Sequence, residues 1–437
     1  MNPLAQELNN GIIGANPHIY EMLSQVGKRL FFPKGILSQS AEAKDKAYRF
    51  NATIGMATHN GRPMVLSSIV KWINLEPEKS ITYAPAFGLP ELRKVWQDYL
   101  YKKNPSLEDK KLSLPVVTHA ITHGLSVVAG MWINPGDTII LPDKMWGNYR
   151  LIFSIRRNAN IANYPLFDQN NVFNLKGFEK TLKEEAKKRE KLVVVLNFPN
   201  NPTGYTPTIK EAEKIKEILL NIAEHGTNLI VVADDAYFGL VYEKGVLKES
   251  IFAYLANQHP RILTIKLDGA TKEDFAWGLR VGFITYATSS PSQRDIVPLY
   301  EALEKKTGGA IRGSISNVNH LGQEILLNAL KAKDYKEEKE LKFNILRERA
   351  EEVKRVLSND RYKDTWSVYP FNSGYFMCIR LKTVNAEELR HHLLKNYGIG
   401  LISLNEKDVR IAFSCIEKKD IHALFDLIFQ AVKDLEK

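Results

Sequence analysis

The lysine of the segment Asp268-Gly-Ala-Thr-Lys272 is the residue whose surroundings point most directly to chemistry. A lysine amine can condense with an aldehyde, and an amine released from such a bond can carry a proton. Two polar segments precede it, Asn197-Phe-Pro-Asn-Asn-Pro-Thr-Gly204 and Asp234-Asp-Ala-Tyr237, and Arg280 follows it. The chain therefore offers an amine, an acid, a phenol, an amide and a guanidinium within one ordered stretch.

Each of these groups also has an ordinary structural explanation. Asn-Pro-Thr-Gly is a good turn sequence, an aspartate at a strand end often caps a helix, and a loop lysine is usually solvated. The joint order of the groups favours a functional site over these separate explanations. One ligand unites them, pyridoxal phosphate, because its aldehyde needs an amine, its pyridine nitrogen an acid and its phosphate a fixed cation.

Short apolar runs rich in β-branched residues are expected to position these groups. Runs of this kind, bounded by polar or turn residues, are typical of strands buried on both faces. A helix is predicted between the second and third runs, with Thr208 and Glu211 forming a capping box and Gly226 following its end. Strand, helix and strand in this order predict a parallel sheet, and ligands bind at its carboxyl edge. The runs are 138–141, 192–196, 229–233, 262–265 and 281–285.

The length of 437 residues favours more than one domain. After residue 318 the pattern becomes long, helical and charged, and then returns to short strand-like runs. We therefore predict an α/β fold with a large domain over residues 66–325, built on a mostly parallel central sheet flanked by helices. Residues 1–65 and 326–437 are expected to form a smaller α+β domain.

Composition narrows the classes of function. We find neither a long apolar span nor a signal peptide, and Cys378 and Cys415 lack metal-ligand spacing, so we expect free thiols, a cytoplasmic location, no membrane contact and no metal. The formal net charge is +10, but lysines alternate with glutamates, as in 183–191. Such segments are typical of solvated helix faces, and no nucleic-acid partner is expected.

The chain resembles the class I and II pyridoxal-phosphate-dependent aminotransferases of fold type I, the group that contains aspartate aminotransferase. The resemblance extends from about Asn51 to Phe413. It is carried by Asn51-Ala-Thr-Ile-Gly55, Gly61-Arg-Pro63, Tyr83-Ala-Pro-Ala-Phe-Gly-Leu89, Pro135-Gly-Asp137, Trp146-Gly-Asn148, Asn201-Pro-Thr-Gly204, Asp234 with Tyr237, Lys272 through Arg280-Val-Gly282, and Arg410.

The resemblance implies a role for each residue around the cofactor ring. Lys272 would be the covalent anchor and the base that moves a proton at Cα. Asp234 would keep the pyridine nitrogen protonated, so that the ring accepts an electron pair. Asn201 and Tyr237 would donate hydrogen bonds to the phenolate oxygen, and Trp146 would cover one face of the ring.

The resemblance also implies how the two ends of the site are held. The backbone amides of Gly124 and Leu125, together with Arg280, would bind the phosphate. Tyr83 matches a tyrosine that reaches the phosphate from the neighbouring subunit, which implies a homodimer with shared active sites. Arg410 would grip the substrate α-carboxylate with Gly55 beside it.

Three positions depart from the aspartate aminotransferase pattern. Gly269 stands where many members have a serine, and Tyr149 takes the place of a histidine, although its phenol could still donate to Asp234. Glu324 stands about where a second arginine would bind an acidic side chain. We therefore expect a neutral donor, aromatic or bulky, and a 2-oxo acid acceptor such as 2-oxoglutarate.

Two other functions remain open from the sequence. The same frame also serves carbon-sulfur β-lyases, since the bond that breaks is the one perpendicular to the cofactor plane. A non-catalytic ligand-sensing module of the same fold is the second alternative. Such modules follow a basic winged-helix domain, and only about fifty residues precede Gly55 here, which disfavours that alternative.

Overall fold

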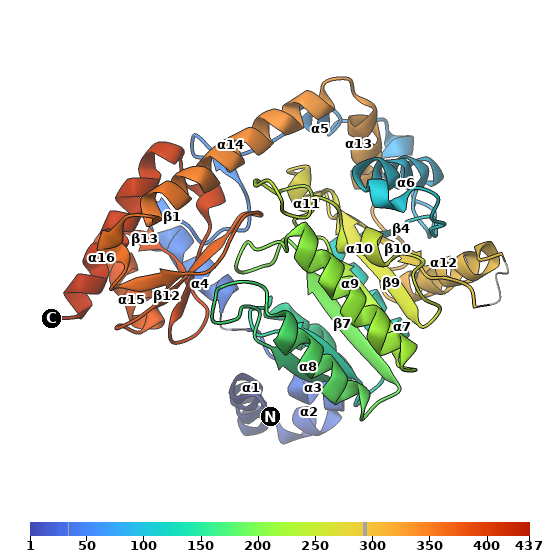
Figure 1. The fold of residues 1–437 in the computed structure, drawn as a ribbon, viewed down its shortest axis with the longest axis horizontal. Helices are drawn as coiled ribbons and strands as arrows, with labels where there is room; N and C mark the ends of the chain where they lie inside the picture. Colours follow the sequence, from blue (N-terminus) through green and yellow to red (C-terminus); the bar gives the residue numbers. More distant parts are fainter. Residues whose placement is uncertain (34, 292–294) are drawn as a thin grey trace.

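A seven-stranded sheet in the order β4-β10-β9-β8-β7-β5-β6 forms the centre of the computed structural model, which describes residues 1–33, 35–291 and 295–437 (Figure 1). Only β10 runs antiparallel to both of its neighbours in this sheet. The five predicted runs are all strands here, but the last of them is the antiparallel one. The strands are β4 (Val116–His119), β5 (Thr138–Pro142), β6 (Asn160–Tyr164), β7 (Lys191–Asn197), β8 (Asn228–Asp234), β9 (Ile262–Gly269) and β10 (Val281–Ala287).

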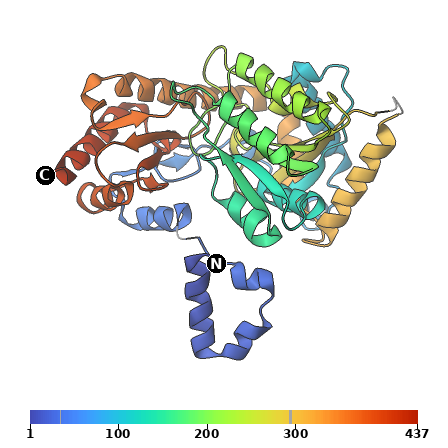
Figure 2. The same ribbon diagram turned by 60° about the horizontal axis from the view of Figure 1, so that its bottom comes forward.

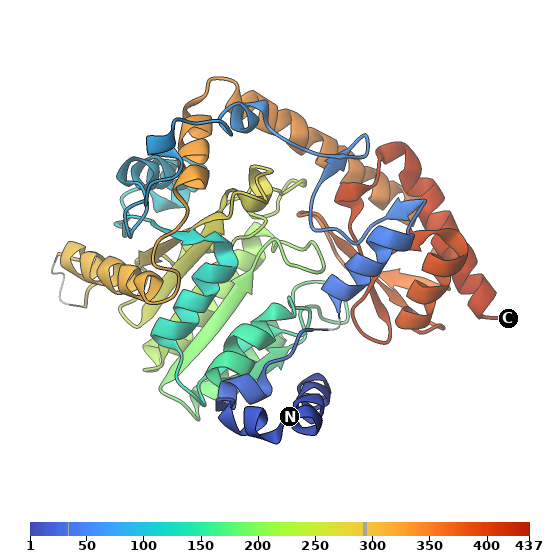
Figure 3. The same cartoon turned by 180° about the vertical axis from the view of Figure 1, so that it is seen from behind.

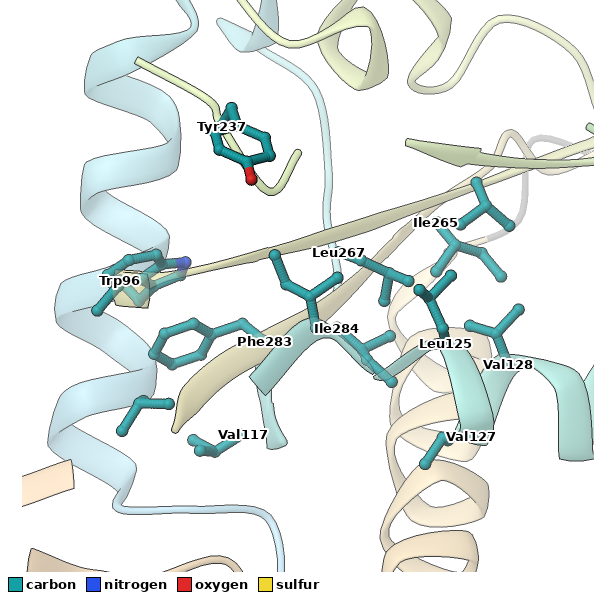
Figure 4. Packing of buried hydrophobic residues seen from close by; sticks show 14 of the residues in the cluster. Trp96, Val117, Leu125, Val127, Val128, Tyr237, Ile265, Leu267, Phe283 and Ile284 are labelled. Atoms are coloured by element: carbon teal, nitrogen blue, oxygen red, sulfur yellow. The ribbon is translucent and has the colours of Figure 1, made fainter. Parts of the chain in front are cut away.

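The central strands are buried on both faces, as their continuous apolar runs predicted. Along β7, Val193 and Val195 pack in the core on one face, whereas Leu192, Val194 and Leu196 pack in the core on the other. This alternation follows from the two-residue period of a strand. Figure 4 shows the first of these cores, where side chains of β9, β10 and α7 interdigitate.

Helices cover the two faces of the sheet (Figures 1 and 3). The helix α9 (Ile209–Glu224) begins with the predicted capping box, because Thr208 accepts from the Glu211 amide and Glu211 accepts from the Thr208 amide. The other helices of this body are α6 (Pro90–Lys103), α7 (Ala120–Trp132), α8 (Leu175–Ala186), α10 (Ile251–Leu255), α11 (Ala270–Glu273), α12 (Val297–Arg312) and α13 (His320–Lys331).

A smaller four-stranded sheet lies at the far end of the long helix α14 (Tyr335–Leu357) (Figure 1). Its order is β11-β12-β15-β14, and all of its pairs are antiparallel. The elements of this part are α4 (Ile36–Lys46), β1 (Phe50–Asn51), β11 (Trp366–Val368), β12 (Met377–Leu381), α15 (Ala386–His392), β13 (Ile399–Gly400), β14 (Ile402–Ser403), β15 (Asp408–Ile411) and α16 (Ile421–Leu435).

The chain enters this smaller part from an N-terminal arm. The helices α1 (Pro3–Ala15), α2 (Pro17–Met22) and α3 (Gln25–Arg29) form a hairpin that projects from the rest of the molecule (Figure 2). After α4 and β1, a short segment carries β2 (Thr58–His59), β3 (Arg62–Pro63) and α5 (Ser67–Val70). Among the described residues, no helix combines the length and the apolar character needed to span a bilayer.

The predicted division into residues 66–325 and 1–65 with 326–437 stays a proposal. Leu346 of α14 belongs to the core of the central sheet, whereas Ala350 and Val353 belong to the core of the smaller sheet. The change of core thus occurs within α14, further along the chain than residue 325. At the other boundary, Ala52 packs with the smaller core and Ala57 with the larger one.

Candidate active site

Three neighbouring strands bring their polar ends to one edge of the central sheet. Asn197 ends β7 and Asp234 ends β8, and the two residues are direct partners in the register. Strand β9 ends at Gly269, and Lys272 lies on the short helix α11 that follows it without a loop. Because all three strands are parallel, the predicted convergence of these side chains at the carboxyl edge is what the topology requires.

A cavity of about 150 Å³ opens at this edge. Six of the residues predicted from the sequence line it, and the amine of Lys272 lies among them. The lining also includes residues that were not predicted from the sequence, such as Ala120, Ile121 and Thr122. The lining residues are Ala120, Ile121, Thr122, Trp146, Tyr149, Asn197, Asn201, Asp234, Ala236, Tyr237, Thr271, Lys272 and Arg280.

The Lys272 amine is poised to lose its proton. Burial lowers its pKa to about 8, and the positive charges of Arg280 and Arg410 contribute in the same direction. Its Nζ donates a 2.9 Å hydrogen bond to the carbonyl oxygen of Gly55, and it lies over the ring of Tyr237 at 5.4 Å. Only the uncharged amine is a nucleophile, so this environment suits covalent attachment to an aldehyde.

Asp234 is a buried carboxylate that also lines this cavity. Tyr149 donates to its Oδ2 at 2.5 Å and the amide of Ala236 donates to Oδ1 at 3.2 Å. Burial raises the pKa of Asp234 to about 6, although both donors act against this rise. The hydrogen bond from Tyr149 confirms that the phenol at the histidine position supports this carboxylate.

Arg410 approaches the cavity from β15 of the smaller sheet. One terminal nitrogen, Nη1, lies 3.3 Å from Asn201 Oδ1, and Nη2 donates to the Thr53 carbonyl at 3.0 Å. Its guanidinium carbon lies 4.1 Å from the ring centre of Phe376. The side chain is 2% exposed, and Nε has no hydrogen-bond partner among the described residues. A buried cation with a free donor is suited to a carboxylate.

The predicted phosphate amides need correction. Gly124 and Leu125 lie one turn inside α7, where helical geometry directs their N–H groups to carbonyls of the preceding turn. A Cβ on Gly124 would lie 3.1 Å from Leu267, and Leu125 packs in the core that Figure 4 shows. The free amides of α7 are those of its first turn, and the cavity is lined there by Ala120, Ile121 and Thr122.

Backbone conformation marks the same end of the cavity. Ala120 and Arg280 both have positive φ, 63° and 55°, although neither is a glycine. Strain of this kind clusters at functional sites, where the surrounding structure holds it in place. Gly282 permits the close approach of β10 to α7, because a Cβ there would lie 2.8 Å from the carbonyl carbon of Ala120. The glycine of the Arg280-Val-Gly282 motif is thus explained by packing.

Packing also explains the glycine that stands in place of a serine. A Cβ on Gly269 would lie 2.5 Å from the carbonyl oxygen of Val281 on the neighbouring strand. A serine therefore does not fit this β9–β10 pairing. Thr271 lines the cavity instead, and its buried Oγ1 has no hydrogen-bond partner among the described residues.

These observations fit pyridoxal phosphate. The amine of Lys272 suits the aldehyde, Asp234 suits the pyridine nitrogen, and Trp146 and Tyr237 offer aromatic surface. The first turn of α7, the free hydroxyl of Thr271 and Arg280 supply donors and a cation for a phosphate.

Tyr83 lies outside this cavity, with 89% of its surface exposed. Among the described residues none covers its side chain, and its predicted contact with a neighbouring subunit stays a proposal.

Comparisons with known proteins agree with the site. Residues 56–428 match the family described as Aminotransferase class I and II. The probable N-acetyl-LL-diaminopimelate aminotransferase of Bacillus subtilis is 29% identical over 47% of this chain and 48% of its own length, so the match spans about half of that relative. The probable aspartate/prephenate aminotransferase of Aquifex aeolicus is 28% identical over 67% of this chain and 68% of its own length.

The fold has a close counterpart among solved structures. The crystal structure of an aminotransferase from Anaerococcus prevotii superposes with a TM-score of 0.82 and 22% identity, covering 94% of this chain and 99% of that chain. The family match covers most of the sequence, including every strand of both sheets. The chain therefore belongs to the class I and II aminotransferases, a family of pyridoxal-phosphate-dependent enzymes of fold type I.

Proposed function

We propose that this protein transfers the amino group of a neutral L-amino acid, aromatic or bulky, to a 2-oxo acid such as 2-oxoglutarate. The observation that carries the reaction type is the placement of Lys272 and Asp234 in one cavity, the amine with a lowered pKa and the acid with a buried hydrogen-bonded carboxylate. Family membership supports the same reaction.

Each residue of the cavity has its own role in the proposed reaction. Pyridoxal phosphate, when bound, supplies an aldehyde for covalent attachment and a ring that accepts an electron pair. Lys272 would provide the attachment and, as a free amine, would carry the proton that leaves Cα. Asp234, fixed by Tyr149, would keep a proton on the pyridine nitrogen. Asn201 and Tyr237 would donate to the phenolate oxygen.

Arg410 binds the α-carboxylate in this proposal. Within the described part of the chain, its Nε has no hydrogen-bond partner and its Nη1 has only a long contact to Asn201, which leaves donors for a planar anion. A guanidinium held by Thr53 and Phe376 fixes the direction of that anion, and with it the bond from Cα to hydrogen. The carbonyl of Gly55 holds the Lys272 amine close by.

The expectation of a neutral donor rests on how nearby cations are paired. A second cavity, of about 420 Å³, shares Trp146 with the first and is lined by apolar residues such as Phe31 and Leu404. Its lysine, Lys144, is bound to two carboxylates at 3.0 Å each, those of Asp143 and Asp408. A donor side chain in this cavity would meet apolar surface and the neutralised Lys144, with Arg150 as a further cation of the lining.

Glu324 and the relatives add to this picture. Glu324 lies on α13 and faces His320 at 3.6 Å, so it offers an acidic donor no attraction. The two named relatives are assigned different substrates, and the family therefore leaves the donor open.

The first experiment measures donor preference. With 2-oxoglutarate as acceptor, kcat/KM for phenylalanine, tyrosine and leucine should exceed that for aspartate. A strong preference for aspartate would overturn the neutral-donor proposal. Arg150 also lines the second cavity, so Arg150→Met in a half-reaction with donor alone serves as a check. The rate with neutral donors should be unchanged. A loss of rate confined to acidic donors would show that Arg150 binds their side-chain carboxylate.

A second experiment separates the reaction types. Without an acceptor, a transaminase releases one equivalent of 2-oxo acid per active site and then stops. A β-lyase continues to turn over and releases ammonia and pyruvate. A ligand-sensing module binds amino acids and releases neither product. One equivalent of 2-oxo acid supports transamination, and each of the other results contradicts it.

A homodimer with shared active sites is part of the proposal. Tyr83 is 89% exposed beside Ile81, which is 82% exposed, and such apolar surface favours association. Sedimentation equilibrium should give twice the chain mass of 49.7 kDa, and Tyr83→Phe should weaken cofactor affinity. A fully active monomer would contradict it. A cytoplasmic location stays a prediction, supported by the two free cysteines.

A further inference from the structure

The residues that flank Lys272 in sequence carry charges that its proposed chemistry does not use. Glu273 ends α11 and Asp274 follows it, and both side chains are buried without lining the cavity. Buried carboxylates are costly unless paired, so their partners reveal what they hold. These partners come from α6 and α14, two helices remote from Lys272 in sequence.

Glu273 lies between two lysines. Lys103 Nζ of α6 donates to both carboxylate oxygens, at 2.9 and 3.0 Å, and Lys339 Nζ of α14 donates to Oε1 at 2.7 Å. Burial would raise the pKa of Glu273, but the two cations outweigh it and lower it to about 2. The backbone of Gly239 packs against this carboxylate, since a Cβ there would lie 2.4 Å from Oε1.

Asp274 is held by the same helix. Lys339 Nζ lies 2.8 Å from its Oδ1, and the hydroxyl of Tyr335 donates to that oxygen as well. Tyr335 and Lys339 are four residues apart on α14, so they lie on one face of the helix. One lysine therefore joins two consecutive carboxylates immediately after Lys272.

The backbone of Lys272 is fixed from the other side too. Its carbonyl accepts a 2.7 Å hydrogen bond from the Tyr375 hydroxyl. Before Lys272 in sequence, Asp268 accepts from Trp96 Nε1 of α6 at 3.1 Å and lies 3.5 Å from Lys266 Nζ. The turn that carries the amine is thus held at both ends by charged or polar contacts.

Lys103 and Lys339 affect the position of the Lys272 amine and not its pKa. Lys103 and Lys339 carry two positive charges, and Glu273 and Asp274 carry two negative ones. Their nearly balanced field leaves Arg280 and Arg410 as the charges that lower the pKa of Lys272. What the contacts fix is the direction in which α11 presents the amine to the cavity.

Helix α14 also reaches the substrate side of the site. Arg349, fully buried, donates to the carbonyls of Thr58 and Ser414 at 2.7 and 2.6 Å and pairs with Glu417 at 2.7 Å. Those segments follow Gly55 and Arg410 in sequence. The helix α14 thus contacts the residues next to Lys272 near its start. Further along, it contacts the segments next to Gly55 and Arg410.

We propose that Lys339 is a positioning residue for the reaction: by holding Glu273 and Asp274 it fixes the α11 turn, and α14 sets that turn relative to the segment of Arg410. This inference rests on the proposed role of Lys272. Lys103 shares the task through Glu273 alone. A misplaced amine still binds the aldehyde but transfers the proton at Cα poorly, because proton transfer depends steeply on geometry.

The test compares three variants of α14 in the cofactor-loaded enzyme. Lys339→Met removes the charge at similar size, and Lys339→Arg keeps it. Lys354→Met, also on α14, removes a surface ion pair that Lys354 forms with Glu243. We expect Lys339→Met to lower kcat by about 10- to 100-fold with little change in donor KM. Lys339→Arg should recover most of the loss, and Lys354→Met should behave as wild type.

A readout independent of turnover accompanies the kinetics. Borohydride reduction followed by peptide mapping measures the yield of cofactor fixed to Lys272, and the apoprotein's unfolding temperature reports on stability. We expect normal fixation in Lys339→Met. A variant that loses stability but keeps wild-type kcat per fixed cofactor would overturn the inference, as would a Lys339→Arg protein as slow as Lys339→Met.

Two further variants keep the test decisive. If Lys339→Met does not fold, Lys103→Met provides the same comparison through Glu273, and a normal kcat there would refute the inference. Lys272→Ala distinguishes a failure of the proposed function from a failure of the positioning role. Full turnover in Lys272→Ala would refute the proposed function itself, whereas an inactive Lys272→Ala beside a normal Lys339→Met would refute only the positioning role.

Discussion

The hydroxyl of Tyr149 lies 2.5 Å from Oδ2 of Asp234, and both side chains are almost fully buried. The tyrosine reaches the aspartate from the segment after Trp146, whose ring meets it edge to face at 5.6 Å. A single phenol therefore orients the carboxylate and contacts the aromatic residue proposed to cover the cofactor. Tyr149, which differs from the histidine of aspartate aminotransferases, thus still donates a hydrogen bond to Asp234.

Tyr149→Phe should weaken catalysis without unfolding the protein. Loss of a donor to a buried carboxylate raises the pKa of Asp234 further above 6, so the acid limb of kcat/KM should move to higher pH. We expect a loss of about 10-fold in kcat/KM at neutral pH. Tyr164→Phe, at a buried tyrosine of the opposite core, is the control. Equal pH profiles for wild type and Tyr149→Phe would contradict the assigned role.

Asp234→Asn should stabilise the apoprotein while abolishing most activity. The folded pKa of about 6 exceeds the ordinary value of 3.8, so the folded state binds the proton more tightly and loses stability as pH rises between them. Above pH 6 the variant should gain about 2–3 kcal/mol over wild type. Thermal unfolding at pH 4 and pH 7 measures this difference, which should nearly vanish at pH 4.

The Lys272 amine should react at lower pH than an ordinary lysine. Its pKa of about 8 against an ordinary 10.5 means that the folded apoprotein releases this proton first, and its stability rises with pH across that window. The labelling rate of Lys272 by an amine reagent, followed by peptide mapping, should show a midpoint near 8. A midpoint near 10 would disprove the effect of burial and of the neighbouring arginines.

Gly269→Ser should destabilise the protein and bring no gain in cofactor affinity. The added Cβ meets the Val281 carbonyl at 2.5 Å, and such overpacking costs about 1–3 kcal/mol. Gly278→Ala is the matched control, because nothing lies within 4 Å of a Cβ there. Chemical unfolding curves and cofactor titrations of both variants test this. A serine variant that is stable and binds cofactor more tightly would show that the strands separate easily.

Arg410→Lys should raise KM for the amino donor and for the 2-oxo acid together, since both present the same carboxylate. A lysine lacks the planar fork, so we expect an increase of about 10-fold or more. Steady-state kinetics with both substrates varied measures it, and Arg355→Lys on the exposed face of α14 is the control. An effect on one substrate only would place the α-carboxylate elsewhere.

Local sequence patterns predicted five of the seven strands of the central sheet, one capped helix and six of the thirteen residues that line the cavity. The apolar runs became β5, β7, β8, β9 and β10, and Thr208 with Glu211 caps α9. These features depend on neighbours within a few residues, or on burial that shows as continuous hydrophobicity. The same holds for Asp234 and Lys272, which follow predicted strands directly.

The phosphate end could not be located in this way. Where α7 begins depends on the end of β4 and on the approach of Gly282 to Ala120, and no local pattern encodes that contact. The sequence therefore suggested Gly124 and Leu125, which lie one turn too far into the helix.

The sequence by itself determined the family, the cofactor and six of the residues that line the cavity, because those groups follow strands in a recognisable order. Only the tertiary structure decided what holds them. Lys339 lies 66 residues from Glu273, and Lys103 lies 170 residues away. Contacts at such separations leave no periodicity in the chain, since they arise from the packing of α6 and α14 against the turn that carries Lys272.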